Sequence, residues 1–318
     1  MSWPLLPDTP VLGLAPMAGI TDRAMRDLCR AFGADFTVSE MVASKPELNA
    51  SRKSQTRHAQ ADEAEPRIVQ LLGTEPEELA AAARFQMARG AQIIDLNMGC
   101  PAKKVCAVAA GSALMADTGR VTEIFQALVE AVSLPVTVKL RTGLDSEQRN
   151  AESIAQLAEA CGLQGVAIHG RTRADKFQGQ AEYETIRRVK QSVGIPVIAN
   201  GDICTPKTAQ DVLKYTGADG LLIGRAAQGY PWIFQEIHHY LETGDTLPPP
   251  DGDTFRHVMR RHIQGLASLY GDLQAARIAR KHIGWYSRHI PNGAQLRQAA
   301  NRLDQTDQQL ELIDRFLT

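Results

Sequence analysis

The stretch RIVQLLGTEPEELAAAARFQMARGAQIIDLNMG (67–99) contains the unit from which the fold can be predicted. Apolar runs rich in β-branched residues occupy 67–73 and 93–99, as in parallel strands that are buried on both faces. Between them, 76–89 has helical periodicity and begins with Pro76, which favours the first turn of a helix. The stretch therefore predicts a strand, a helix and a second strand.

The same unit is repeated along the chain as far as residue 243. Eight strand–helix units in succession are typical of an α/β fold of the (β/α)8 TIM-barrel type. An open doubly wound sheet would have a GxGxxG turn after its first strand, but Pro16-Met17-Ala18-Gly19 stands there. We therefore expect a barrel domain over 1–243. Its further strands are predicted at 11–17, 36–41, 136–141, 165–170, 197–202 and 220–226, and a further helix at 120–132.

A proline-rich linker at 244–253 precedes a purely helical region, 254–318, which predicts a small all-α helical bundle. This region carries ten Lys or Arg and five Asp or Glu, although the whole chain carries 35 and 36. Such a basic appendage favours a polyanionic partner, but solvated arginines on surface helices would give the same count. The helices are expected at about 254–270, 273–289, 293–302 and 304–317.

The composition of the 318 residues, 44% hydrophobic and 22% charged, is typical of a globular protein. No run approaches the roughly 18 apolar residues of a membrane span, and the first ten residues lack the basic character of a signal peptide. The five cysteines are odd in number and widely spaced, which argues against a disulfide framework or a zinc site. We expect a reduced, cytoplasmic enzyme without a bound metal.

Polar residues stand at nearly every predicted strand end, where the active sites of such barrels lie. Stability alone does not explain so many, because each buried polar group costs a few kcal/mol if it is unpaired. The residues concerned are Gln70, Asn97, Cys100, Lys139, Arg141, His169, Asn200, Gly201, Asp202, Gly224 and Arg225.

The last two strand ends predict a phosphate site. Loops after the seventh and eighth strands of such barrels commonly bind phosphate. Gly201 and Gly224 would allow backbone N–H groups to approach an anion, and Arg225 would supply positive charge.

Lys139 lies inside a predicted strand, where a lysine that points into the barrel mouth needs an anionic partner. The N1–C2=O edge of a reduced flavin carries such a charge. Neutralisation of Asp95 or Asp202 is the alternative.

Asn97 and Cys100 close the fourth strand and suit chemistry on a planar amide such as uracil. Asn97 could bond the amide edge, and Cys100 could deliver or accept a proton. A thiol that acts as a general acid must stay protonated at neutral pH. Lys103 and Lys104 follow in the same loop, and Cys106 could be a resolving thiol or a packed loop residue.

An ordered set of motifs spans the barrel and enters the helical region. Together the motifs resemble those of the bacterial tRNA-dihydrouridine synthases, and their sequences are most similar to those of the B-type enzymes. They are LAPMAGITD (14–22), SEM (39–41), QLLG (70–73), DLNMGCPAKKV (95–105), AGSALM (110–115), VKLRTG (138–143), IHGRTR (168–173), VIANGD (197–202), IGRAAQG (223–229) and ARIARKHIGWY (276–286).

The resemblance implies an FMN enzyme whose flavin is reduced by NADPH. It would reduce the C5=C6 bond of a flipped-out D-loop uridine in tRNA. The similarity to the B-type enzymes implies that this uridine is at position 17. It implies that Cys100 donates a proton to C5 while hydride reaches C6, and that Asn97 helps to hold the base. FMN would be held by Pro16, Met17, Ala18, Gln70, Lys139, His169, Asn200, Gly201, Asp202, Gly224 and Arg225.

The basic residues elsewhere are expected to bind tRNA, and we expect a monomer. Ile278 and Trp285 would anchor their helix to the bundle and leave its basic face free for phosphates. The expected tRNA-binding side chains are Arg141, Lys103, Lys104, Arg277, Arg280, Lys281 and His282.

Two other functions remain open at this point. A dihydroorotate dehydrogenase is another FMN barrel with a similar Asn-x-x-Cys-Pro element, but a small free pyrimidine requires no basic tail. A non-catalytic RNA-binding protein would have no need of Cys100 and Lys139 beside a phosphate site.

Overall fold

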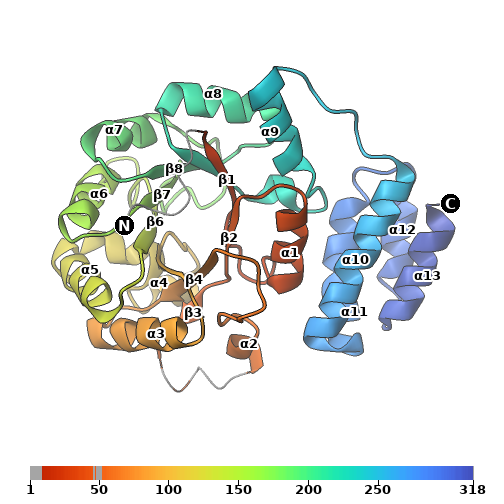
Figure 1. Cartoon of the computed structure of the whole chain (residues 1–318), viewed down its shortest axis with the longest axis horizontal. Helices are drawn as coiled ribbons and strands as arrows, with labels where there is room; N and C mark the ends of the chain where they lie inside the picture. The colour runs from red at the N-terminus through yellow and green to blue at the C-terminus, as the bar shows by residue number, and fades with distance from the viewer. Residues whose placement is uncertain (1–8, 46, 48–51, 318) are drawn as a thin grey trace.

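The computed structural model describes residues 9–45, 47 and 52–317, without the side chains of 52, 53, 103 and 104. Within these residues a ring of parallel strands closes through the pairing of β1 with β9, of β1 with β2 and of β2 with β4, as predicted for a TIM barrel (Figure 1). The strands are β1 (Val11–Leu14), β2 (Phe36–Val38), β3 (Val42–Ala43), β4 (Arg67–Leu72), β5 (Ile93–Met98), β6 (Val136–Arg141), β7 (Val166–His169), β8 (Val197–Asn200) and β9 (Gly220–Ile223).

All eight predicted strands are confirmed, but several end earlier than the sequence suggested. The first was expected to reach residue 17 and ends at Leu14, and the second was expected to reach residue 41 and ends at Val38. The short strand β3 pairs only with β4 outside the ring and was not predicted. The apolar residues beyond β1 and β2 therefore belong to loops at the barrel mouth.

Helices surround the strands, and residues at their first turns explain where several begin. Asp22 accepts a hydrogen bond from the N–H of Met25 at the start of α1, and Thr205 and Thr208 cap α8 reciprocally. These helices bury one apolar face against the outside of the barrel. They are α1 (Arg23–Ala31), α2 (Arg52–Gln55), α3 (Pro76–Ala88), α4 (Lys103–Cys106), α5 (Thr118–Ala131), α6 (Ala151–Ala160), α7 (Glu184–Ser192), α8 (Pro206–Thr216) and α9 (Ile233–Thr243), with 3-10 turns η2 (Gly111–Ala116) and η3 (Arg225–Ala227).

The predicted C-terminal bundle is also confirmed, and its first helix begins at Gly252 because Asp251 accepts a hydrogen bond from Thr254 N–H. The segment from Gly244 to Asp251 has no helix or strand. No helix among the described residues combines the length and the apolar character needed to cross a bilayer. The bundle consists of α10 (Gly252–Tyr270), α11 (Asp272–Tyr286), α12 (Gly293–Ala300) and α13 (Thr306–Phe316).

The bundle shares a hydrophobic core with the barrel side, where α10 lies beside α1 (Figure 1). Leu28 of α1 and Trp232, which precedes α9, are buried in this core. The ring of Trp232 lies 4.6 Å from that of Phe255 and 5.4 Å from that of Phe32. We propose that the barrel domain (1–243) and the helical domain (254–318) therefore unfold as one unit.

Trp232→Ala should lower the free energy of unfolding by about 3–5 kcal/mol, because it empties the shared core. The measurement is urea unfolding followed by far-UV circular dichroism. Leu273→Ala, at a side chain that is 54% exposed, is the control and should change stability by less than about 0.5 kcal/mol. Two separate transitions in the wild type would contradict a common unfolding unit.

Candidate active site

The carboxyl ends of the strands bring the predicted polar residues together at one mouth of the barrel. The strand register pairs Asn97 with Lys139 on neighbouring strands, and His169 with both Arg141 and Asn200. The loops after β1 and β9 also meet, because Gln228 Nε2 lies 3.4 Å from Met17 Sδ. The site is therefore built from chain segments that are far apart in sequence.

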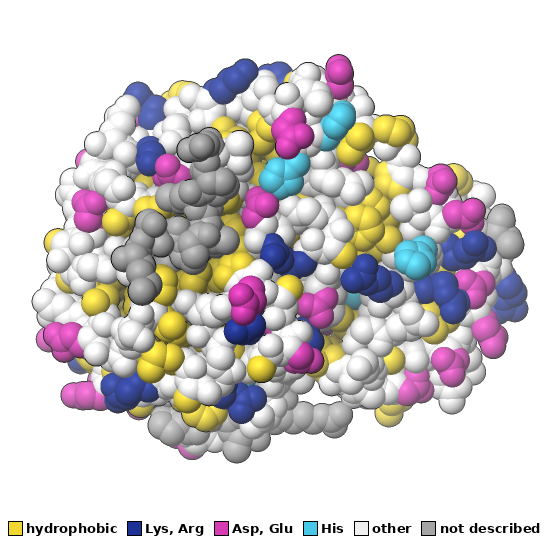
Figure 2. All heavy atoms as spheres, viewed as in Figure 1, with side chains coloured by type: hydrophobic (Ala, Val, Ile, Leu, Met, Phe, Trp, Pro, Cys, Tyr) yellow, Lys and Arg dark blue, Asp and Glu magenta, His cyan; other side chains and the backbone are white. Residues whose placement is uncertain are grey.

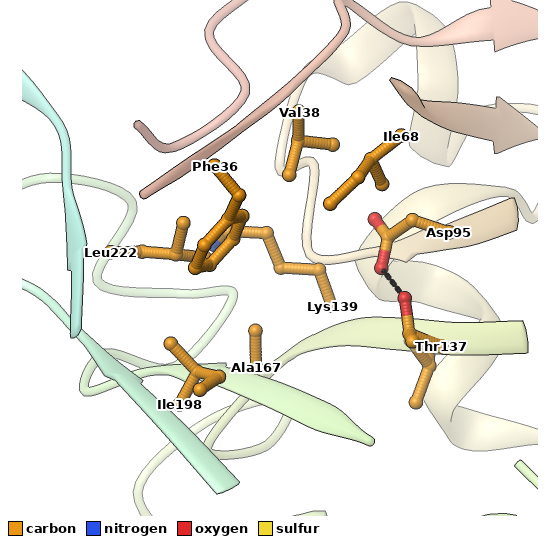
Figure 3. A pocket seen from close by; sticks show the side chains of 10 residues that line it. Phe36, Val38, Ile68, Asp95, Thr137, Lys139, Ala167, Ile198 and Leu222 are labelled. Atoms are coloured by element: carbon orange, nitrogen blue, oxygen red, sulfur yellow. Dashed lines mark hydrogen bonds between the residues drawn. The ribbon is translucent and has the colours of Figure 1, made fainter. Parts of the chain in front are cut away.

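Lys139 is a partly buried cation whose Nζ donates a hydrogen bond to Asn200 Oδ1 at 2.9 Å. Burial, and then the nearby charge of Arg141, lowers its pKa to about 8. Figure 3 shows the Lys139 side chain crossing the barrel interior towards Phe36 and Leu222. Neither Asp95 nor Asp202, the two alternative partners of Lys139, forms a salt bridge with it. Asp95 accepts hydrogen bonds from Thr137 and Gln70, and Asp202 accepts from two arginines. Within the described chain Lys139 forms no ion pair, which suits an anionic ligand.

Asp202 joins two arginines at the mouth. Arg171 donates to both carboxylate oxygens at 3.0 and 2.6 Å, and Arg225 donates to Oδ1 at 2.8 Å. Arg171 is buried and was not predicted as a site residue, although it follows directly on the strand that ends at His169. We infer that Asp202 acts by orienting these two guanidinium groups.

His169 lies in the same cluster, with Nε2 3.3 Å from Arg171 Nη1. Burial lowers its pKa to about 2, and the charges of Lys139, Arg141, Arg171 and Arg225 act in the same direction. The imidazole is therefore neutral at physiological pH, so it can offer one donor and one acceptor.

The predicted phosphate site lies after two paired strands, β8 and β9. Gly201 has a φ of 123°, and a side chain there would begin 2.8 Å from Ala181 Cβ and 2.9 Å from the His169 ring. Only glycine fits this approach. The side chain of Arg225 is 57% exposed at the start of η3, so its remaining donors can reach a ligand.

The Cys100 loop is held by the side chain of Asn97. The backbone N–H groups of Gly99 and Cys100 donate to Asn97 Oδ1 at 3.2 and 3.0 Å, while Asn97 Nδ2 donates to Gln70 Oε1 at 2.7 Å. Cys100 is half-buried, and burial raises the pKa of its thiol. The thiol is thus protonated at neutral pH, as a general acid must be.

Cys106 packs against the same loop. Its Sγ lies 3.6 Å from the Cys100 carbonyl oxygen and 3.7 Å from Ser112 Oγ. These contacts favour the packed loop residue over the resolving thiol.

Arg141 is almost fully buried and connects two loops. Its Nε donates to the Gly99 carbonyl at 2.7 Å, and Nη1 donates to the carbonyls of Thr172 and Lys176. The guanidinium carbon lies 5.4 Å from the centre of the Phe177 ring, which is 57% exposed and was not predicted. Arg141 thus positions the Cys100 loop here, and its direct contact with substrate stays a prediction.

The model of the dihydrouridine synthase (Dus) family matches residues 13–318. The chain belongs to this family.

Curated dihydrouridine synthases resemble it over nearly their whole length. It is 53% identical to tRNA-dihydrouridine synthase B of Pseudomonas syringae pv. tomato over 96% of this chain and 90% of that protein. The enzymes of the same name from Yersinia pestis and Vibrio vulnificus are 54% and 50% identical over 95% of this chain and 94% of theirs.

A solved structure of histamine dehydrogenase from Rhizobium sp. 4-9 has a similar fold, with a TM-score of 0.51 and 12% identity. The similarity covers 81% of this chain and 48% of that one, and it shows the fold alone.

In this dihydrouridine synthase the basic face predicted for the tail helix is not formed as expected. Arg277 is exposed, but Arg280 pairs with Asp304 at 2.6 Å, and Lys281 donates to the Gly19 carbonyl of the loop after β1. His282 is 1% exposed and cannot reach a phosphate in this structure. Helical spacing predicts which residues share a face of α11, but it does not predict which other segments pack against that face. The side chains of Lys103 and Lys104 lie outside the described residues.

The two anchor residues behave differently. Ile278 packs against the shared core as predicted, whereas Trp285 is only partly buried and stacks edge-on with His282 at 5.0 Å between ring centres.

Lys281 brings the tail into contact with the barrel mouth. It lies near Asp22 and Glu40, whose charges oppose the lowering of its pKa by burial. Glu40 is itself buried, accepts the N–H of Gly19 and pairs with Arg57 at 2.6 Å. The loop that contains Met17 is therefore held between the barrel and the tail.

His282 and His262 should make stability depend on pH. Their rings meet edge to face with 4.4 Å between the ring centres, and His262 Nε2 and both nitrogens of His282 lack hydrogen-bond partners among the described residues. Burial lowers the pKa of His262 to about 3 and that of His282 well below 6.5. Below pH 6.5 the unfolded chain therefore binds more protons, and stability falls by about 1.4 kcal/mol per pH unit for each histidine.

His282→Leu should remove one histidine's share of that slope. Urea unfolding at several pH values between about 6.5 and 4.5 measures the slope in both proteins. The pKa of Asp22, which is raised to about 6, makes stability rise as the pH falls, but it does so equally in the wild type and in His282→Leu. Equal slopes would show that His282 is protonated in the folded protein.

Proposed function

We propose that the protein is a tRNA-dihydrouridine synthase that uses FMN and NADPH to reduce the C5=C6 bond of a D-loop uridine. The observation that carries the proposal is that one barrel mouth holds both the Cys100 thiol, whose pKa is raised by burial, and Lys139, a partly buried cation without a salt bridge among the described residues. Relatives that carry this name, at 50–54% identity, support tRNA as the substrate. Their B-type designation supports position 17.

The charges at the mouth suit FMN. A partly buried lysine without a carboxylate partner among the described residues suits the N1–C2=O edge of the flavin, and Gly201, Gly224 and Arg225 suit its phosphate. The neutral ring of His169 can bond a polar edge without adding charge. The residues proposed to hold FMN are Pro16, Met17, Ala18, Gln70, Lys139, His169, Asn200, Gly201, Asp202, Gly224 and Arg225.

The chemistry divides between cofactor and protein. Bound flavin, once reduced by NADPH, supplies hydride to C6 of uracil. Because the C5=C6 bond is conjugated to the C4 carbonyl, the base then requires a proton at C5. Cys100 holds that proton, and Asn97 and Arg141 hold the loop that carries it.

The uridine lies in a folded tRNA and must be extruded into the barrel mouth. Lys and Arg side chains lie over the helical tail on the face shown in Figure 2, together with acidic ones. We propose that exposed cations of this kind, Arg277 among them, bind tRNA phosphates, and that Lys103 and Lys104 bind RNA near Cys100. The enzyme would act as a monomer in the cytoplasm, where its tRNA substrate is found.

Neither alternative function explains the whole site. A dihydroorotate dehydrogenase acts on a small free pyrimidine and would not require a helical tail that contacts the loop at Gly19. A non-catalytic RNA-binding protein would gain nothing from a thiol at a strand end in the same barrel mouth as a partly buried lysine that forms no salt bridge with the described residues.

Cys100→Ala should keep its flavin and its NADPH oxidation but lose dihydrouridine formation by about 10²–10⁴-fold, because the general acid is removed. The measurement is dihydrouridine per tRNA with FMN, NADPH and unmodified transcript. Cys106→Ala is the matched control and should be nearly silent. Unchanged tRNA turnover in Cys100→Ala would contradict the proton-donor assignment, and a wild type without flavin absorbance would contradict the function.

Arg277→Gln should weaken tRNA binding and reduce the slope of log affinity against log salt by up to about one unit. Arg280→Gln, in which the lost cation was already paired with Asp304, should change that slope less. Filter binding at several salt concentrations compares the two. Equal slopes for Arg277→Gln and wild type would show that Arg277 is a solvated surface charge.

A further inference from the structure

A continuous row of hydrogen bonds runs from the barrel interior to the Cys100 loop. Asp95 accepts from Thr137 Oγ1 at its Oδ1 and from Gln70 Nε2 at its Oδ2, both at 2.7 Å. Gln70 Oε1 in turn accepts from Asn97 Nδ2 at 2.7 Å. Asn97 Oδ1 then accepts from the backbone N–H of Cys100 at 3.0 Å. All four side chains are buried.

The row has a fixed direction because its two ends have opposite character. The backbone N–H of Cys100 can only donate, and an ionised carboxylate at Asp95 can only accept. Each amide between them, Gln70 and Asn97, must therefore turn its NH2 towards Asp95 and its C=O towards Cys100. An amide alone could flip, because its two ends are nearly equal in size.

Asp95 has no other evident task at the site. The Lys139 ammonium bonds Asn200 instead, and Figure 3 shows the Asp95 carboxylate directed at Thr137. A cavity of about 20 Å³ lies among Asp95, Thr137 and Lys139. The charge of Lys139 nevertheless favours the ionised form, against the effect of burial, which raises the pKa of Asp95.

We propose that Asp95 is a positioning residue, which fixes the orientation of the Gln70 and Asn97 amides and thereby the loop that carries Cys100. The acceptor at Asp95 Oδ2 is the essential feature. Even a protonated Asp95 could turn its hydroxyl to Thr137, whose own hydroxyl can accept, and still accept from Gln70. The proposal rests on the proposed function only in taking Cys100 as the proton donor.

The decisive comparison is between Asp95→Ala and Asp95→Asn. Alanine removes the acceptor, whereas asparagine can keep an oxygen towards Gln70 and donate its NH2 to Thr137. The charge is lost in both variants. Thr137→Val is a matched control, because it removes a hydroxyl from Asp95 without interrupting the row between Asp95 and Cys100.

The first readout is alkylation of Cys100 by iodoacetamide, which requires neither flavin nor tRNA. Peptide mass spectrometry separates Cys100 from Cys106, because trypsin cleaves at Lys104 between them. Asp95→Ala should raise the Cys100 rate by about tenfold, the factor expected for one lost buried hydrogen bond. Asp95→Asn and Thr137→Val should stay close to wild type. Cys106 serves as the internal reference.

The second readout is dihydrouridine formation by the flavin-loaded enzyme. In Asp95→Ala, kcat should fall by about tenfold with little change in the KM for tRNA, since the thiol is misplaced and the tail is intact. Asp95→Asn should restore kcat.

Three results would overturn the proposal. They are unchanged Cys100 alkylation in Asp95→Ala, alkylation of Asp95→Asn as fast as that of Asp95→Ala, or loss of kcat in Asp95→Asn. If Asp95→Ala does not fold, Gln70→Leu breaks the same row one link further on and should also raise Cys100 alkylation, and an unchanged rate there would overturn it too. A wild type that forms no dihydrouridine would refute the proposed function, while the alkylation series would still decide the role of Asp95.

Discussion

Strands β1 and β9 pair in parallel from Val11–Gly220 to Leu14–Ile223, and this contact turns an open sheet into a closed barrel. A side chain at position 220 would begin 2.4 Å from the carbonyl oxygen of Val11, so glycine permits the closure. Once the sheet is closed, every strand ends at the same rim. The loop after β1 then meets the loop after β9, and the site can draw on the whole length of the barrel sequence.

Closure also concentrates positive charge. Four cations lower the pKa of His169: Lys139, Arg141, Arg171 and Arg225. Among the described residues, Asp202 is the only carboxylate that forms a salt bridge with any of them. Burial is the main reason why His169 stays neutral and why the pKa of Lys139 falls, and this surplus of positive charge acts in the same direction. A bound anion would relieve the repulsion, so these charges would strengthen the affinity of the mouth for anionic groups such as the proposed flavin phosphate and reduced ring.

The strands could be predicted from sequence because buried parallel strands are continuous apolar runs, and that pattern is local. Their ends were less certain, since Ala15 and Met17 are apolar but belong to the loop after β1. The prediction of a free basic face on α11 was wrong for a different reason. Spacing places Arg277, Arg280 and Lys281 on one helix, but it cannot show that Asp304 and the Gly19 carbonyl occupy two of them.

The roles of residues that depend on partners far away in the sequence could not be predicted either. Arg171 and Phe177 lie in a loop after β7 that carries no strand or helix pattern, and Arg141 turns out to bond backbone carbonyls. The row from Asp95 to Cys100 crosses twice between two chain segments, so neither of the motifs QLLG and DLNMGCP reveals it alone, although together they contain all of its members.

The shared core between barrel and tail gives the arrangement a functional meaning. The segment from Gly244 to Asp251 alone would leave the tail free to turn, and a base delivered by such a tail would reach Cys100 in many orientations. Leu28 and Trp232 bury the tail against the barrel instead, and Lys281 fixes it to the loop at Gly19. The distance from a phosphate on the tail to the thiol is then set by packing. If the tail binds tRNA phosphates as proposed, that distance would select which nucleotide enters the mouth, and residues far from Cys100 would help to determine the target.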